Sequence, residues 1–367
     1  MRRLGFLSSF LAILLMCSCI PGTTTPSSSA NPTPTITTDA TNTITATHAE
    51  SELQVIVLDV GQADCILLKT DDHTMLIDAG DIGQNSIVLN YLAYYGIKKL
   101  DYLVATHPHA DHIGAMAAVV RAMDHIGTII MPDATTTTNV FENLLDAIEE
   151  KSVPITIAVP GETFALGNAQ VQIIAPNGTN YRDLNDFSVV LRVVFGDSVF
   201  LFTGDAETQS ENEQLAGTLP LDADVLKVGH HGSRTSSTQR YLDAVSPRYA
   251  VISCGQGNSY GHPHSEAMSR LVATGAEIYR TDESSTIIFT TDGETITVDT
   301  TRIPPGTMQP SILPPNPSGT TYVGNINSKI FHLPTCGSLP QEQNRVYFAT
   351  RDEATEAGFT PCSVCKP

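Results

Sequence analysis

The sequence predicts an α/β fold in which two β-sheets pack face to face under outer helices, followed by a small C-terminal module. Helical patterns occupy residues 87–96, 113–123 and 140–150. Strand-like apolar runs recur between and after them, at residues 53–60, 65–70, 74–80, 101–107, 128–132, 171–176, 188–195, 198–205, 223–230, 249–254 and 285–291. Two stacked sheets with helices outside would bury the apolar faces of both kinds of element.

Two segments poor in core-forming residues divide the chain of 367 residues. Residues 20–50 are rich in Thr, Ser and Pro, which is typical of an extended tether that cannot bury a core. A second, Pro-rich linker covers residues 301–320. We therefore expect one globular domain at residues 51–300 and a separate module at residues 321–367.

Residues 1–19 have the pattern of an export signal. Two arginines precede an apolar run that ends at Met16 and is too short for a comfortable membrane span. The ending resembles a bacterial lipoprotein lipobox, with Cys19 as the lipidated residue because the small Ser18 precedes it, or Cys17 as the alternative. This resemblance implies a protein on the extracytoplasmic face of the cell membrane, held by lipid alone, without a transmembrane helix in the mature chain. An ordinary cleaved signal peptide remains the other interpretation.

The formal net charge of −19 belongs to one segment of the chain. Residues 51–300 hold 13 basic and 33 acidic residues, whereas the tether and the C-terminal module are close to neutral. An acidic domain disfavours a protein that coats nucleic acid through a basic surface. Seven cysteines in 367 residues are too few for a disulfide scaffold.

Histidines gather in three loops that follow strand-like runs. Residues 106–112, THPHADH, place three imidazoles and a carboxylate within six residues, which is a strong signal for divalent transition metals. Side chains so closely spaced must splay apart, and this suits two adjacent metal ions better than one. The three groups are His107, His109 and His112; His230 and His231; and His262 and His264.

The order and spacing of these motifs resemble the metallo-β-lactamase superfamily and, more narrowly, the hydrolase domain of ComEC-type competence proteins. The resemblance covers about residues 52–300 and implies an αββα sandwich with a metal site along one sheet edge. It rests on LDVGQADC (58–65), LIDAG (76–80), THPHADHIGA (106–115), NDFSVVL (185–191), FLFTGD (200–205), LKVGHHGS (226–233) and YGHPH (260–264).

The resemblance implies a site for two divalent ions, zinc or manganese. Asp205 would bridge the two ions, and His231 is the alternative to His230 because one residue of register decides between them. Asp59 and Asp78 would orient ligating imidazoles, or equally cap turns. The implied ligands are His107 and His109 for the first ion, and Asp111, His112, Asp205 and His230 for the second.

One departure from the family concerns the first ion. Many members supply a further histidine there, but this sequence has none between His125 and His230. The corresponding NDFS segment offers Asn185, Asp186 and Ser188 as contacts to metal or substrate. An oxygen-richer site shifts the preference from zinc toward manganese.

Such a site predicts hydrolysis by an activated water. Two metal ions lower the pKa of a bridging water toward neutrality and stabilise charge on the substrate oxygens. Asp111 would hold the attacking hydroxide as a catalytic residue, and His264 or His262 would donate a proton or bind a phosphate oxygen. A rigid GHPH turn is the alternative for those histidines, and Ser233 and Arg234 are further candidate phosphate contacts.

The C-terminal module carries a second metal pattern. The segment resembles the metal-binding module of Ada-type DNA-repair proteins, in which four cysteines serve. A structural zinc ion would supply folding energy to a segment with little core. A disulfide between Cys362 and Cys365 is the alternative, and Cys65 and Cys254 are expected to be packed core thiols. The four candidate ligands, which suit tetrahedral zinc, are His332, Cys336, Cys362 and Cys365.

Three functions remain open from the sequence. The leading hypothesis is a metal-dependent hydrolase of phosphodiesters, DNA or nucleotides, with a connection to DNA uptake. The second is a hydrolase of a lactam, lactone or thioester. The third is a non-catalytic binding protein at the cell surface. Fold alone does not choose among them.

Overall fold

The computed structural model describes residues 52–300, 322–325, 328–340, 345–348, 350–356 and 358–367. The expected signal at residues 1–19 with Cys19, the tether at 20–50 and the linker at 301–320 lie outside the described residues. Among the residues that the structure describes, no helix is long and apolar enough to cross a membrane.

The first sheet has eight strands in the order β15-β14-β1-β2-β3-β4-β5-β6. The β1, β2 and β3 strands form an antiparallel meander, and β3 to β6 run parallel. Because β1 also pairs with β14, this sheet joins the two ends of the domain. Its strands are β1 (Leu53–Val57), β2 (Ile66–Lys69), β3 (Thr74–Ile77), β4 (Lys99–Val104), β5 (His125–Met131), β6 (Ile155–Ile157), β14 (Ile287–Thr291) and β15 (Ile296–Asp299).

The second sheet has seven strands in the order β13-β12-β11-β10-β9-β8-β7. The β7 to β10 strands are antiparallel, and β10 to β13 run parallel. All residues of β12 are buried, as expected of a strand covered on both faces. The strands are β7 (Thr163–Leu166), β8 (Ala169–Ala175), β9 (Val190–Phe195), β10 (Ser198–Phe202), β11 (Val225–Lys227), β12 (Tyr249–Ile252) and β13 (Glu277–Arg280).

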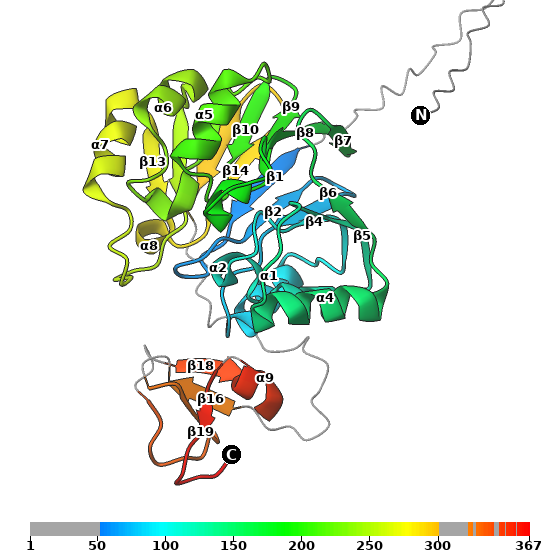
Figure 1. Ribbon diagram of the computed structural model, residues 1–367, viewed down its shortest axis with the longest axis vertical. Helices are drawn as coiled ribbons and strands as arrows, with labels where there is room; N and C mark the ends of the chain where they lie inside the picture. Colours follow the sequence, from blue (N-terminus) through cyan, green and yellow to red (C-terminus); the bar gives the residue numbers. More distant parts are fainter. Residues whose placement is uncertain (1–51, 301–321, 326–327, 341–344, 349, 357) are drawn as a thin grey trace, which may run out of the picture. The chain divides into compact units, whose positions relative to one another are not determined.

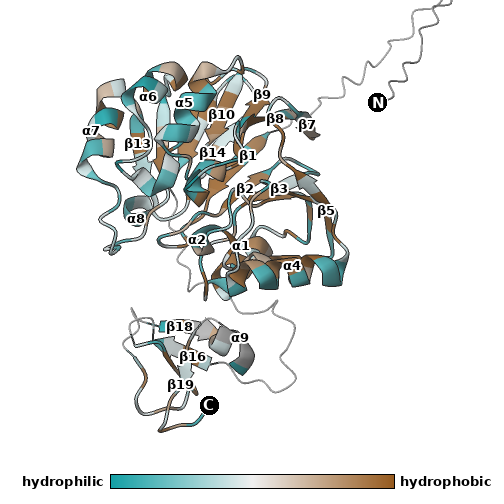
Figure 2. Ribbon diagram, in the orientation of Figure 1, coloured by the Kyte–Doolittle hydropathy of each residue, from teal (hydrophilic) through white to brown (hydrophobic). Residues whose placement is uncertain are grey.

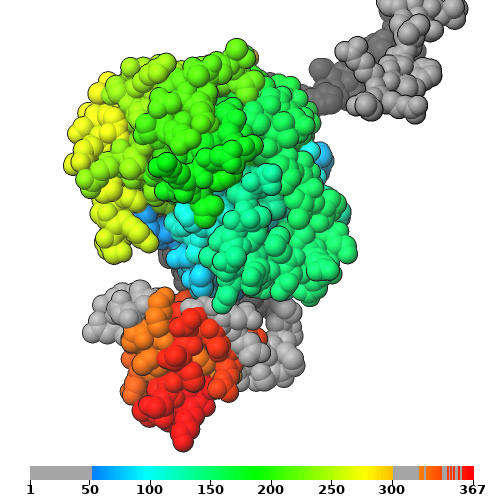
Figure 3. Space-filling view, viewed as in Figure 1, coloured from blue at the N-terminus to red at the C-terminus, as the bar shows by residue number. Residues whose placement is uncertain are grey.

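Helices cover the outer face of each sheet (Figures 1 and 2). Three clusters of apolar side chains form between these layers. One cluster lies between the sheets, and the other two lie between a sheet and its helices. Figure 3 shows the two halves of residues 52–300 packed into one continuous body. The α/β expectation of two stacked sheets under outer helices is therefore confirmed. The helices are α1 (Asn85–Tyr94), α2 (Ala110–Ile113), α3 (Met116–Ala122), α4 (Asn139–Lys151), α5 (Thr208–Ala216), α6 (Gln239–Val245), α7 (Ser265–Thr274) and α8 (Thr281–Ser284), with 3-10 turns η1 (Leu184–Phe187) and η2 (Gly229–Gly232).

Each apolar run in the sequence contains a strand, but four short strands had no such signal. The β6, β7, β13 and β15 strands carry mostly exposed or half-buried residues, so hydropathy alone does not distinguish them from loops. They lie at or next to the sheet edges, where one neighbour is missing. The expected helix at 113–123 is also divided, into α2 and α3.

Gly114, between α2 and α3, permits a close backbone approach that positions the site. A Cβ atom there would lie 2.1 Å from the carbonyl carbon of Asp81. With no side chain in the way, Gly114 N–H donates to the Gly80 carbonyl at 2.9 Å, and Ala79 N–H donates to the His112 carbonyl at 2.7 Å. These bonds hold the loop after β3 against α2.

The C-terminal module has a four-stranded sheet in the order β18-β16-β17-β19 with one described helix. Its small core consists of Phe331, Phe348, Ala354 and Phe359. The elements are β16 (Tyr322–Asn325), β17 (Ile330–His332), β18 (Arg345–Phe348), α9 (Arg351–Glu356) and β19 (Thr360–Pro361).

Candidate metal centre

The loop after β4 delivers the His-x-His-x-Asp-His motif to the edge of the sandwich. His107 follows the strand and is fully buried. His109 takes the N-cap position of α2, and the one turn of this helix presents Asp111 and His112. The His107 Nε2 and His109 Nδ1 atoms are 3.0 Å apart, and the ring centroids of His107 and His112 are 4.1 Å apart.

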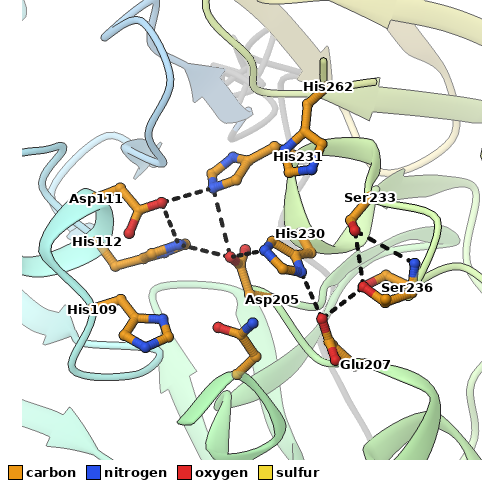
Figure 4. A network of polar contacts seen from close by, with 12 residues as sticks. His109, Asp111, His112, Asp205, Glu207, His230, His231, Ser233, Ser236 and His262 are labelled. Atoms are coloured by element: carbon orange, nitrogen blue, oxygen red, sulfur yellow. Dashed lines mark hydrogen bonds and ion pairs between the residues drawn. The ribbon is translucent and has the colours of Figure 1, made fainter. Parts of the chain in front are cut away.

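Four of the candidate side chains meet at one point, drawn in Figure 4. Asp111, His112, Asp205 and His231 each direct a ligand atom into a group whose atoms all lie within 4.8 Å of one another. The His112 Nε2 atom is 3.2 Å from Asp205 Oδ2, and the His231 Nε2 atom is 3.3 Å from Asp111 Oδ2. The two histidines come from opposite sheets and the carboxylates lie between them.

We call Asp111, His112, Asp205 and His231 the quartet. In both of its imidazoles the Nδ1 atom already has a hydrogen-bond partner. The His112 Nδ1 atom is 2.7 Å from Asp78 Oδ2, and the His231 Nδ1 atom is 2.9 Å from the Ser253 carbonyl. Both partners are hydrogen-bond acceptors, so Nδ1 carries the proton and Nε2 is left to bind a ligand inside the group. Among the described residues, His112 Nε2 and Asp205 Oδ1 are buried without a hydrogen-bond partner. The residues therefore fit a divalent metal ion with nitrogen and oxygen ligands.

The electrostatics of the quartet show how strongly its charges are coupled. Burial disfavours a charged His112, but nearby carboxylates, Asp205 first, raise its pKa well above the usual value. Burial likewise opposes a charged His231, yet Asp205 and a further buried carboxylate raise its pKa to about 10. Burial would raise the pKa of Asp205, but the two imidazoles hold it well below its usual range. The two imidazoles of the quartet thus hold protons whose positive charge compensates the carboxylates. A bound metal dication would supply that positive charge instead.

His230 and His231 diverge although they are neighbours in the chain. Both have left-handed backbone conformations, with φ of 50° and 52°, which residues with a Cβ seldom adopt. The structure groups His231, rather than His230, with the other three ligand atoms. His230 Nε2 remains 3.7 Å from Asp205 Oδ2, while its Nδ1 atom is 2.9 Å from Glu207 Oε1. Of the two alternatives for the ligand, His230 and His231, this geometry therefore favours His231.

The NDFS segment lies beside the motif histidines. The Ser188 hydroxyl is 3.4 Å from His107 Nδ1 and accepts a bond from Asp205 N–H at 3.0 Å. The Asn185 Oδ1 atom is buried and has no hydrogen-bond partner among the described residues. Asp186 instead accepts the N–H groups of Glu207 and Ser210 at 3.1 Å, so its carboxylate caps the start of α5.

Asp78 and Asp59 have different surroundings. Besides His112, Asp78 accepts the backbone N–H of Thr106 at 2.8 Å and its hydroxyl at 2.7 Å, which ties the β3 end to the motif. Asp59 accepts from Gly61 N–H at 3.4 Å and from the Ser285 hydroxyl at 3.2 Å. These contacts of Asp59 correspond to the turn-capping interpretation, whereas Asp78 orients an imidazole.

The remaining candidates have separate contacts. His262 stacks on His231 with centroids 6.2 Å apart, and its burial, followed by the charges of His230 and His231, lowers its pKa to about 4. His264 Nδ1 accepts the backbone N–H of Arg234 at 3.1 Å. The Ser233 hydroxyl is buried and lies 2.8 Å from that of Thr235.

Lys227 and Asp64 are buried next to the quartet, and the sequence interpretation did not include them. Lys227 is fully buried, and its Nζ atom is 2.8 Å from Asp64 Oδ2. Asp64 in turn lies 3.4 Å from His231 Nδ1 and 4.0 Å from His112 Nδ1. The available signal was a lysine inside the apolar run 223–230, because a charge is seldom buried without a partner. Its partner, however, is supplied by the other sheet.

The C-terminal module brings its four candidate ligands together. The ligand atoms of His332, Cys336, Cys362 and Cys365 all lie within 4.8 Å of one another. All three cysteines are free thiols, so the expected alternative of a Cys362–Cys365 disulfide is not the observed state. The Leu333 N–H donates to Cys365 Sγ at 3.3 Å, which would stabilise a thiolate. Cys65 and Cys254 are buried free thiols, as expected.

Comparisons with known proteins identify a family for each of the two domains. The family model described as the metallo-beta-lactamase superfamily matches residues 58–256, more than half of the chain. The model described as the metal binding domain of Ada matches residues 315–367. Among solved structures, the metallo-beta-lactamase fold protein YhfI from Bacillus subtilis has 14% identity and a TM-score of 0.47, covering 65% of this chain and 100% of that chain.

Two curated relatives match most of the hydrolase domain, and one of them is named as a competence protein. ComE operon protein 3 of Bacillus subtilis (strain 168) is 29% identical over 258 residues, which cover 65% of this chain and 33% of the relative. Competence protein ComA of Neisseria gonorrhoeae is 34% identical over 244 residues, which cover 65% of this chain and 32% of the relative. The chain thus spans about a third of the length of these relatives. With the family model, they confirm the resemblance drawn from the motifs: the chain belongs to the metallo-β-lactamase superfamily and carries an Ada-type metal-binding domain at its C-terminal end.

Proposed function

We propose that this protein is an exported, membrane-anchored metal-dependent hydrolase that cleaves phosphodiester bonds in nucleic acid or nucleotides. The observation that carries the proposal is the convergence of two oriented imidazoles and two carboxylates on one point beside His107 and His109. The name of one curated relative, a competence protein, supports a nucleic-acid substrate. A role in DNA uptake is part of the same proposal.

The proposed centre holds two divalent ions, zinc or manganese. His107 and His109 would serve the first ion, and Asp111, His112 and His231 the second, with Asp205 between them. Metal ions bound in this arrangement would lower the pKa of an attacking water and stabilise charge on the phosphate oxygens. The Ser188 hydroxyl is 3.4 Å from His107 Nδ1, and the buried Asn185 Oδ1 has no hydrogen-bond partner among the described residues. These two oxygens would serve the first ion in place of the further histidine.

The chain's own groups then position the reactants. Ionised Asp111, whose pKa is lowered to about 2 although burial alone would raise it, can accept a hydrogen bond from water and hold its lone pair toward the phosphorus atom. His264 Nδ1 is an acceptor for Arg234 N–H, so a neutral His264 carries its proton on Nε2. We assign that N–H to a hydrogen bond with a phosphate oxygen of the substrate.

The test uses the soluble chain from residue 50 onward. Metal content is measured first, and hydrolysis of a phosphodiester panel, DNA, RNA and lactams is then assayed with manganese or zinc. Asp111→Ala should abolish cleavage, whereas Asp243→Ala, at an exposed aspartate of α6, should retain it. Cleavage of lactams alone, or no phosphodiester cleavage with any metal, would overturn the proposal. Full activity of Asp111→Ala would contradict the assigned site.

The C-terminal module is proposed to hold one structural zinc ion through His332, Cys336, Cys362 and Cys365. Cys362→Ser should lower the zinc content by one ion per chain, and Ser363→Ala, at an exposed neighbour, should leave it unchanged. The same zinc content in Cys362→Ser would refute this site.

Export and lipid anchoring at Cys19 are proposed from the sequence pattern alone. Expression of the full chain in a bacterial host should place it in the membrane fraction with an acylated N-terminal fragment in the mass spectrum. Cys19→Ala should release it from that fraction. Acylation that survives this substitution would assign the anchor to Cys17 instead.

A further inference from the structure

A line of aromatic rings leads from the candidate metal centre to the protein surface. His231 and His262 stack with centroids 6.2 Å apart and planes inclined by 27°. His262 and Tyr260 continue the stack, with centroids 5.7 Å apart and planes inclined by 23°. The side chain of Tyr260 ends the line and is 67% exposed. The ring stacks on His262, and its exposed fraction leaves much of it in contact with solvent.

The loop that carries Tyr260 is held by its own hydrogen bonds. Asn258 accepts the His262 N–H at 3.0 Å and donates its amide to the carbonyls of His262 and Gly255, at 2.6 and 2.9 Å. From the opposite sheet, Gln62 accepts the Gly255 N–H at 3.0 Å and places its amide nitrogen 3.3 Å from His262 Nδ1. Single exposed apolar residues are common on protein surfaces and need no function. Tyr260 differs from these in that hydrogen bonds hold the loop around it and its ring stacks on His262, a catalytic candidate.

The acidic charge of the domain limits how it can bind a nucleic acid. Residues 51–300 are strongly acidic, so their net charge does not favour the binding of a polyanion. Proteins that bind single strands obtain much of their affinity by stacking successive bases on aromatic side chains, and this stacking does not depend on protein charge. An exposed tyrosine ring beside a metal centre is suited to that role.

We propose that Tyr260 is a stacking platform for a nucleobase of a single-stranded nucleic acid substrate. The inference rests on the proposed phosphodiesterase function and names its substrate class. The ring centroid of Tyr260 lies no further from that of His231 than the sum of the two centroid distances, which is short enough to be spanned by a few nucleotides. The stacked base therefore belongs to a nucleotide one to a few positions from the scissile phosphate. The Arg234 side chain is 57% exposed and lies 3.5 Å from Glu266 Oε1, while its backbone N–H donates to His264. It is a candidate partner for an intervening phosphate.

The experiment compares two substrates in the metal-loaded soluble chain. One is a short single-stranded oligothymidylate, and the other is an oligomer of the same length in which abasic residues replace the nucleotides around the cleavage site. Tyr260→Ala should lower kcat/KM for the oligothymidylate by about 5- to 150-fold, the loss expected for one base–aromatic stack. Tyr260→Phe should retain activity because the ring is kept. Tyr94→Ala, at an exposed tyrosine of α1, is the matched control and should change neither substrate.

The outcomes separate this inference from the function on which it rests. If the wild-type chain cleaves neither oligomer but cleaves another phosphodiester of the panel, the single-stranded substrate class is refuted and the hydrolase remains. If it cleaves no phosphodiester with any metal, the phosphodiesterase proposal itself fails. If it cleaves both oligomers and Tyr260→Ala lowers neither rate, or lowers both equally, the stacking platform is refuted and the hydrolase remains. Selective loss on the base-bearing substrate, with recovery in Tyr260→Phe, supports the platform.

Discussion

The buried pair of Lys227 and Asp64 allows a quantitative test of how the site is held. The two side chains are 0% and 2% exposed, with 2.8 Å between Nζ and Oδ2, and they join the second sheet to the first. Coulombic attraction from Lys227 and the nearby imidazoles keeps the pKa of Asp64 below its usual value, although burial opposes this. Replacing Lys227 with Met removes the charge but keeps most of the side-chain volume.

Removing one partner of a buried pair destabilises a protein by about 3–5 kcal/mol, because the remaining charge is left without compensation. In Lys227→Met the Asp64 carboxylate still faces His231 Nδ1 at 3.4 Å and His112 Nδ1 at 4.0 Å. We therefore expect the lower end of the range, about 3 kcal/mol. For a domain of this size, such a loss lowers the melting temperature by about 6–12 °C.

The assay is thermal unfolding of the metal-free soluble chain, followed by far-ultraviolet circular dichroism. The double variant Asp64→Asn/Lys227→Met removes both charges and should be more stable than Lys227→Met alone. Lys98→Met, at an exposed lysine, should stay within about 0.5 kcal/mol of the wild-type chain. A Lys227→Met protein that melts within 2 °C of wild type, or a double variant less stable than the single one, would refute the reasoning.

Three further predictions follow from the same geometry. Gly114→Ala should destabilise the fold by about 1–3 kcal/mol or more because its new Cβ meets backbone atoms, whereas Gly337→Ala meets nothing; equal melting temperatures would exclude this. Asp78→Asn should weaken zinc binding about 10- to 100-fold in a chelator competition by removing the carboxylate that orients His112, and unchanged affinity would show that the contact is dispensable. Since the raised pKa of about 10 keeps His231 protonated at neutral pH, zinc must displace that proton, so affinity should rise with pH between 6.5 and 8.5; a pH-independent affinity would contradict the assigned ligand.

Much of the fold was predictable because its signals are local. Apolar runs and helical patterns identified most strands and three helices, since burial imposes those patterns on neighbouring residues. The short edge strands, such as β6 and β13, lacked a signal because exposed strands have no buried face to encode. The division of the expected helix at Gly114 depends on backbone from another loop, which no pattern within the helix records.

The candidate site divides in the same way. By itself, the sequence determined the chemistry: three imidazoles and a carboxylate in residues 106–112, further histidines after other strands, and a His-Cys set in the tail. These residue types and spacings indicate metal binding whatever their position in the fold. Only the tertiary structure decided which of His230 and His231 joins the quartet, because two adjacent left-handed residues direct their rings differently and Ser253 lies beside only one of them. It also decided that Asp64 compensates Lys227, since a buried charge is compensated by a neighbour in space rather than in sequence.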